Sequence, residues 1–179
     1  MKRKTAVFAA VLCALAAAFV VLGGCAEEEG TALSGSMTLV FDSKDTQETD
    51  ALFEVDLSAY TDQDSPMDVL SDLVKEGKAC YEGGGGLYGT YLTAVGTIAE
   101  TADENGQTVK TENFILRQDA SAGIYLYIYT NVAADQADYE GMSTVEYEGQ
   151  TLVESAKGIG GMHLQDGAVV YLTTIVYGA

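Results

Sequence analysis

Few side chains in this sequence are of the kinds that carry catalysis or bind transition metals. His163 is the single histidine, and no serine or cysteine motif stands beside it. A catalytic nucleophile needs a base within hydrogen-bonding reach, and a zinc site needs several nitrogen or sulfur ligands. A lone histidine next to a turn is more often structural or solvated. We therefore predict a protein that is not an enzyme, that binds no metal and that carries no cofactor.

Three carboxylates gather where a helix is expected to begin. Asp62, Asp64 and Asp68 surround Ser65 and Pro66, which suit the N-cap and the first position of a helix. Such a cluster could hold Ca²⁺, although it lacks the glycine and the distal bidentate glutamate of a helix-loop-helix calcium loop. The alternative, which we favour, is that the carboxylates cap the helix and complement its dipole.

Four consecutive glycines, residues 83–86, raise the question of a phosphate-binding loop. Phosphate loops of this kind continue into a lysine and a helix, and neither follows here. We expect residues 83–86 to form a flexible loop, because glycine reaches backbone conformations that other residues avoid.

Tyrosines give the strongest lead to a function. In residues 124–129, isoleucine or leucine alternates with tyrosine, so that one face of a strand would carry Tyr125, Tyr127 and Tyr129. Tyrosine combines a rigid apolar ring with a polar tip, which suits reversible recognition. The alternative is that this face packs under the helix or a loop, with its hydroxyls satisfied at the rim. The predicted ligand-binding set adds residues from neighbouring strands: Tyr88, Tyr91, Tyr125, Tyr127, Tyr129 and Tyr171. Tyr177 lies an even number of residues from Tyr171, so a strand would place both on the same face.

The first residues have the three-part pattern of an export signal. Basic residues 2–4 precede an uncharged apolar stretch, residues 6–21, which falls short of the roughly 20 apolar residues of a spanning helix. The run Leu22-Gly23-Gly24-Cys25 that follows resembles the bacterial lipobox. This resemblance implies a lipid on the Cys25 sulfur, cleavage before it, and a location on the outer face of the cell membrane. An ordinary cleaved signal and a single-pass anchor are the alternatives.

The mature chain would be strongly acidic and free of internal disulfides. Six basic residues would remain against 27 acidic ones, a balance that repels nucleic acid and anionic lipid headgroups. We expect no nucleic-acid partner, and we attribute the acidity to solvation of exposed faces. Cys13 would leave with the signal and Cys25 would be acylated, so that Cys80 has no partner. We expect Cys80 to be a buried, small apolar residue.

The rest of the pattern predicts strands around one helix. Residues 65–77 have a helix start, apolar residues at helical spacing and a terminal glycine. Alternating or short apolar runs predict strands at 37–41, 51–58, 87–101, 124–129, 144–147, 150–154 and 168–177. A further strand, the partner of 87–101, is predicted to follow the Asn105-Gly106 turn and to end near residue 116. Turns are predicted at Asn105-Gly106, Glu148-Gly149 and Asp166-Gly167. The last strand is nearly all apolar, which favours a central position. This order predicts an α+β fold with one helix on a mixed sheet, preceded by the signal-peptide helix.

Several segments together resemble a bacterial surface domain that is similar to the carboxy-terminal domain of transcobalamin and intrinsic factor. They are Met67–Leu70, Gly89–Gly96, Tyr125–Asn131 and Gly161–Leu172, in this order. The resemblance implies a β-grasp-like fold over about residues 37–177 and a corrinoid as one possible ligand. The sequence departs from the family pattern at Leu126, where a tryptophan is usual, and at Val132, where a glycine is usual.

We therefore predict a signal peptide at 1–24, a flexible tether at 25–36 and one domain at 37–179. The favoured function is a lipid-anchored, extracytoplasmic binding module for a corrinoid, another small ligand or a surface partner. The alternative is a structural or adhesive surface protein that acts through a sheet edge or the tyrosines. A hydrolase that acts through acidic residues is the least favoured, since it needs two carboxylates facing each other across a cleft.

Overall fold

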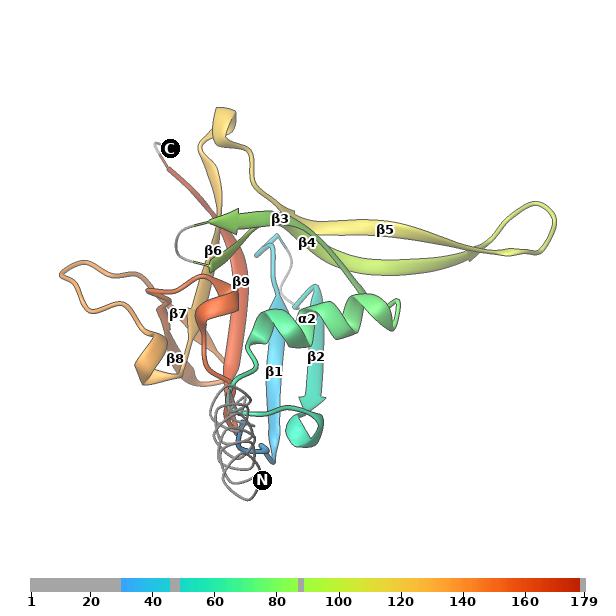
Figure 1. Cartoon of the computed structure of the whole chain (residues 1–179). Coiled ribbons are helices and arrows are strands. Elements are labelled where there is room, and N and C mark those ends of the chain that lie inside the picture. Colours follow the sequence, from blue (N-terminus) through green and yellow to red (C-terminus); the bar gives the residue numbers. More distant parts are fainter. Residues whose placement is uncertain (1–29, 46–48, 87–88, 178–179) are drawn as a thin grey trace, which may run out of the picture. The chain divides into compact units, whose positions relative to one another are not determined.

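The computed structural model describes residues 30–45, 49–86 and 89–177. Within Thr31–Ala179, which form one compact unit, six strands build a mixed sheet (Figure 1). Along the sheet they are β2 (Ala51–Asp56), β1 (Ser36–Phe41), β9 (Val169–Val176), β6 (Ile124–Thr130), β8 (Gln150–Glu154) and β7 (Thr144–Tyr147). The β1–β9 pair is parallel, and the other neighbours are antiparallel. The predicted central position of the last strand is confirmed, because β9 lies between β1 and β6.

A second sheet, of three strands, contains β3 (Ala79–Gly86), β4 (Gly89–Ala102) and β5 (Thr108–Arg117). The expectation of a single mixed sheet was therefore wrong. Leu92, Val95 and Leu116 of this second sheet are buried in the same core as residues of β6 and β9. The chain thus packs these strands face to face with the larger sheet.

The glycine run is a strand and not the loop that we predicted. Residues 83–86 extend β3 and pair with β4, with a register shift between Glu82 and Gly83. A β-carbon on Gly83 would lie 2.3 Å from the backbone oxygen of Tyr91. The absence of a side chain therefore permits close approach of two strands, which is a common reason for glycine in a sheet.

The predicted helix is α2 (Pro66–Lys75), the one α-helix among the described residues. Its start is fixed by Asp68, whose carboxylate accepts hydrogen bonds from the backbone N–H and the hydroxyl of Ser65 at 2.8 and 2.7 Å. Short 3₁₀ turns complete the fold: η1 (Leu57–Ala59), η2 (Ala120–Ala122), η3 (Ala133–Asp135) and η4 (Ile159–Gly161). The fold is therefore mixed α+β, as predicted.

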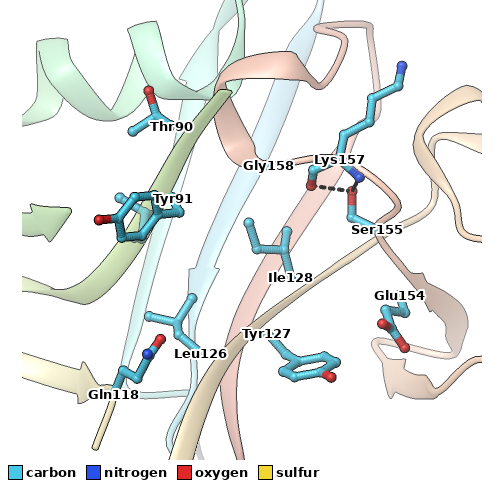
Figure 2. A pocket seen from close by; sticks show the side chains of 11 residues that line it. Thr90, Tyr91, Gln118, Leu126, Tyr127, Ile128, Glu154, Ser155, Lys157 and Gly158 are labelled. Carbon is cyan, nitrogen blue, oxygen red and sulfur yellow. Dashed lines mark hydrogen bonds between the residues drawn. The ribbon is translucent and has the colours of Figure 1, made fainter. Parts of the chain in front are cut away.

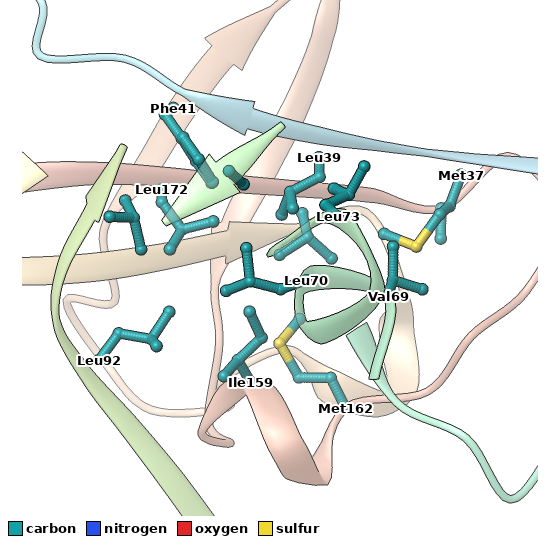
Figure 3. Close-up of a cluster of buried hydrophobic side chains, with 14 of the residues drawn as sticks. Met37, Leu39, Phe41, Val69, Leu70, Leu73, Leu92, Ile159, Met162 and Leu172 are labelled. Atoms are coloured by element: carbon teal, nitrogen blue, oxygen red, sulfur yellow. The ribbon is translucent and has the colours of Figure 1, made fainter. Parts of the chain in front are cut away.

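One core joins the helix, both sheets and η4 (Figure 3). Val69, Leu70 and Leu73 of α2 are buried against one face of the six-stranded sheet. That face presents alternate residues of its central strands, among them Met37, Leu39, Phe41, Val170 and Leu172. Burial of large aliphatic side chains contributes about 1.5–3 kcal/mol each, so this layer supplies most of the driving force for folding.

The predicted signal-peptide helix, Cys25 and the first part of the predicted tether lie outside the described residues. Thr31 and Leu33, within the segment expected as tether, bond to the body: the Thr31 N–H donates to Asp62 at 2.7 Å, and the Leu33 N–H to the Tyr60 carbonyl at 2.9 Å. Of the helices in the described ranges, none has the length and apolar character to cross a membrane.

The close approach at Gly83 gives a stability prediction. Gly83→Ala forces the β-carbon into the Tyr91 carbonyl and should lower the free energy of unfolding by about 1–3 kcal/mol, which is several degrees of Tm for a domain of this size. Gly85→Ala is the matched control, because nothing lies within 4 Å of its added β-carbon. Thermal unfolding followed by circular dichroism compares the two. Equal Tm values would contradict the steric explanation.

Candidate functional site

Six tyrosines form a continuous row on the face of the larger sheet that is turned away from α2. We call this row the tyrosine face: Tyr125, Tyr177, Tyr127, Tyr129, Tyr171 and Tyr147. Successive ring centroids along it are 5.7, 6.1, 6.4, 6.4 and 5.6 Å apart. The structure therefore brings together Tyr125, Tyr127, Tyr129 and Tyr171 of the predicted set, and adds Tyr147 from the edge strand β7, which the sequence did not indicate.

The inner part of the tyrosine face is buried. Tyr129 and Tyr171 are each 2% exposed. Tyr147 of β7 contacts Tyr171 of β9, although β8 and β6 lie between these strands in the sheet, so the sheet curls over the inner rings. A ligand cannot reach Tyr129 or Tyr171 unless these strands separate, and we do not retain them as binding residues.

The buried hydroxyls have partners inside the protein. The Tyr171 hydroxyl donates to the Asp42 carboxylate, and the Tyr129 hydroxyl lies 3.0 Å from Ser143 Oγ. Burial and the Asp42 hydrogen bond together raise the pKa of Tyr171 well above its usual range, so this hydroxyl remains a donor at all physiological pH values. The accessible rings are at the far end, where Tyr125 and Tyr177 are 36% and 57% exposed.

Tyr91 is separated from the tyrosine face. It lies on β4, and its ring covers Gly84 of β3, since a β-carbon on Gly84 would come within 3.1–3.4 Å of ring atoms and the hydroxyl of Tyr91. Gly84 thus makes room for an aromatic ring across the strand pair. Tyr91 is 56% exposed and lines a cavity. Tyr88, the remaining member of the predicted set, lies outside the described residues.

The cavity lies between β4 and β6 and has a volume of about 280 Å³ (Figure 2). Leu126 and Ile128 of β6 extend into it, and Thr90 faces them from β4. Tyr91 lines the cavity beside Thr90, with its hydroxyl pointing away from Leu126 and Ile128. Gln118 closes one end, and Ser155 and Gly158 border the other. The ammonium group of Lys157 points away from the cavity in this view. The lining is therefore mainly apolar, with Thr90, Gln118 and Ser155 as uncharged hydrogen-bonding groups and the charged residues Glu154 and Lys157 at the margin.

One backbone position on β6 also faces the cavity. The N–H and C=O of Ile124 both bond to Asp119, at 2.9 Å each, and the Ile128 carbonyl accepts from the Ser155 N–H at 2.8 Å. In a strand, backbone groups two residues apart point to the same side. The N–H and C=O of Leu126, midway between the two, therefore point to this same edge. A ligand in the cavity can bond to both groups while its apolar surface contacts Leu126 and Ile128.

An ion cluster around one buried carboxylate stands near this cavity. The Asp135 side chain is fully buried, and its carboxylate accepts from Lys157 Nζ at 2.9 Å, His163 Nδ1 at 2.6 Å and the His163 backbone N–H at 2.8 Å. Burial alone would raise the pKa of Asp135, but these donors outweigh it and hold the pKa below its usual value. His163 has no serine or cysteine nucleophile among these contacts, so the cluster holds η3 and the segment before β9 together.

The carboxylates at the helix start serve local structure. Asp62 accepts from the Thr31 N–H, Asp64 from the Thr61 N–H and hydroxyl, and Asp68 from Ser65. Within the described ranges, no group of three or more acidic, histidine or cysteine side chains is arranged to hold a metal ion. Cys80 is 2% exposed, and burial raises the pKa of its thiol, which suits a packing role.

Comparison with known proteins gives a distant structural likeness. A solved structure from Ruminococcus gnavus ATCC 29149, provisionally described as a metal binding protein, shares 18% sequence identity over 79% of this chain and 96% of that chain, with a TM-score of 0.42. No protein-family model and no curated protein matches the chain. A likeness at this level says nothing about what the chain binds.

The Asp135 cluster predicts a pH-dependent stability. Folding lowers the pKa of the Asp135 carboxyl. The ionised carboxylate therefore contributes its full stabilisation at pH values above the pKa of the unfolded chain, about 3.9. This stabilisation is lost as the pH falls through the lower pKa of the folded protein. Asp135→Asn should lower the free energy of unfolding at pH 7 by roughly 1–3 kcal/mol. The difference from the unchanged protein should shrink towards pH 2.5.

Urea unfolding at both pH values measures this difference. Asp138→Asn is the control, because Asp138 is an exposed neighbour and its change should have little effect at either pH. A difference for Asp135→Asn that stayed constant with pH would refute the charge-based explanation.

Proposed function

We propose that this chain is a lipid-anchored, extracytoplasmic binding module, and not an enzyme, that takes a small uncharged ligand in the cavity between β4 and β6. The observation that carries the proposal is the backbone of Leu126. Its donor and acceptor face a cavity with apolar walls formed by Ile128 and Tyr91. Binding sites of small molecules combine these two features, a mainly apolar lining and a few fixed polar groups.

The composition of the cavity narrows the chemical class of the ligand. Its polar groups include Thr90, Gln118 and Ser155, which bond to hydroxyl or amide groups, and the charged residues Glu154 and Lys157. The Lys157 ammonium group bonds to Asp135, and the Glu154 carboxylate accepts from the Ser143 hydroxyl, so each charge already has a partner inside the protein. The formal net charge of the whole chain is −18. The chain therefore repels anionic ligands that come within the screening length of its surface. A neutral molecule with a ring to lie against Tyr91 meets both conditions.

A corrinoid is the specific candidate that the family resemblance adds. We also propose that the fold is β-grasp-like, as the resemblance implies, because α2 packs across a mixed sheet. The cavity volume of about 280 Å³ lies just below the range of ordinary ligand pockets, about 300–1,000 Å³. A corrinoid would therefore place only an edge or a side group in the cavity, and the exposed Tyr91 ring would contact the remainder.

Binding can be tested with cyanocobalamin as the probe in isothermal titration calorimetry. We expect saturable heat that Tyr91→Ala weakens at least tenfold, because the ring forms one wall of the cavity. Tyr81→Ala is the matched control, since Tyr81 is an exposed tyrosine of the same sheet that lies outside this cavity. Absence of heat would remove the corrinoid, and equal weakening by both changes would remove the cavity.

The lipid anchor is proposed from the run Leu22-Gly23-Gly24-Cys25. Several acyl chains on Cys25 would hold the domain firmly, since each buried methylene contributes about 0.8 kcal/mol. We expect Cys25→Ser to move the protein from the membrane fraction to the soluble fraction of the cells that make it. Cys80→Ser should leave it with the membrane. A mature protein that still began at Met1 in mass spectrometry would overturn both the anchor and the location.

A further inference from the structure

The β4–β5 hairpin ends the smaller sheet in an exposed arm. Residues 99–113, which include the outer halves of both strands and the turn, are all exposed, and Figure 1 shows the arm reaching well beyond α2. Within the described ranges, β5 pairs with β4 alone. A two-stranded ribbon has little stability in water by itself, and an open edge is a template for another strand.

The backbone groups on this open edge can be identified. At the tip of the arm, the Asp103 N–H donates to the Gln107 carbonyl at 2.8 Å. Paired residues of an antiparallel ladder alternate between hydrogen-bonded and non-hydrogen-bonded pairs. Counting along the register from this bond, Val109, Thr111 and Asn113 bond inward to β4. The residues whose N–H and C=O point outward are Thr108, Lys110, Glu112 and Phe114.

A bond on the opposite side of the hairpin agrees with this count. Ile98 of β4 stands opposite Glu112, and its N–H donates to the Lys78 carbonyl at 3.2 Å, towards β3 and away from β5. The Ile98–Glu112 pair is therefore not hydrogen-bonded within the hairpin. It follows that the backbone of Glu112 faces the open edge.

We propose that this edge pairs with β5 of a second copy of the chain, antiparallel and about a two-fold axis at Thr111. In this register Lys110 stands opposite Glu112 of the second copy, and Glu112 stands opposite its Lys110. Thr108 likewise meets Phe114 of the second copy. Every outward-facing backbone position then meets another outward-facing position, as an antiparallel ladder requires.

Charge selects this register among its neighbours. A shift to a two-fold axis at Lys110 would place the two Lys110 side chains opposite each other, and an axis at Glu112 would do the same for the two glutamates. Opposite charges directly across a strand pair stabilise it, and like charges destabilise it. An axis between two residues would bring outward-facing backbone groups against inward-facing ones. The axis at Thr111 avoids both penalties.

The surroundings of the edge favour a second copy over an unrelated acidic or basic partner. Lys110 already bonds to Glu100 at 3.0 Å, so that Glu112 of a second copy would complete a row of alternating charges. The face of the arm opposite to Lys110 and Glu112 carries uncharged residues, among them Ala99, Thr101, Val109 and Thr111. An uncharged surface of this kind lets two strongly acidic chains approach.

Disulfide trapping of the full chain in detergent tests the register. Thr111→Cys should form a disulfide-linked dimer under mild oxidation, because residues at a non-hydrogen-bonded pair have Cα atoms about 4.5 Å apart, within the range of a disulfide. Val109→Cys and Asn113→Cys should not link when each is alone. Mixed together, they should link to each other, since Val109 stands opposite Asn113 of the second copy.

Failure of Thr111→Cys to link at a rate above that of the unchanged chain would overturn the proposal. Linking of Val109→Cys alone at the rate of Thr111→Cys would also overturn it, because chance collision in a micelle would then explain both. These outcomes are independent of any ligand in the cavity between β4 and β6.

A charge exchange tests the same pairing without cysteine. Glu112→Lys and Lys110→Glu each create two like-charge pairs across the axis and should weaken self-association roughly tenfold. A mixture of the two variants should recover it as a heterodimer, because each lysine then meets a glutamate. Sedimentation equilibrium in density-matched detergent measures the three samples. Variants that associate as well alone as in the mixture would contradict the register.

Discussion

The whole architecture depends on burying both faces of β9 at once. Val170 and Leu172 belong to the core beneath α2, while Val169 and Tyr171 belong to a second cluster on the other face. Since side chains alternate along a strand, no slip of one residue could satisfy both clusters. This constraint fixes the register of β9 against β1 and β6 together. It thereby fixes the positions of Leu126 and Ile128 in the cavity and of Tyr127 and Tyr129 on the tyrosine face.

Sequence patterns predicted the parts of the fold that rest on local chemistry. The helix start at Ser65, the turn at Glu148–Gly149 and the alternation in β6 all appear where expected, because capping, positive φ angles and period-two burial are properties of short segments. The φ angles of Glu148 and Gly149 are 48° and 76°. The separation into two sheets was not predictable in this way, since it depends on which strands exchange hydrogen bonds across long distances in the chain.

The candidate site shows the same division. Alternation placed Tyr125, Tyr127 and Tyr129 on one face, but it could not show that β7 would curl over Tyr129. The glycines of β3 looked like a loop because glycine is rare within strands. The contacts with Tyr91 explain Gly83 and Gly84. No sequence pattern pointed to the cavity at Leu126. The edge of β6 is open there because its partners on that side, Asp119 and Ser155, bond to this strand at Ile124 and Ile128, and this pairing depends on the tertiary fold.

The row of tyrosine rings also makes the molecule its own optical reporter. The chain has no tryptophan and eleven tyrosines, so ultraviolet emission and near-ultraviolet dichroism arise almost wholly from tyrosine. Rings at 5.6–6.4 Å spacing couple electronically, and the coupling of Tyr147 to Tyr171 exists only while the β7–β8 hairpin stays folded over the sheet. Loosening of that hairpin would thus become visible in the native aromatic spectrum, without any label, before the main core opens.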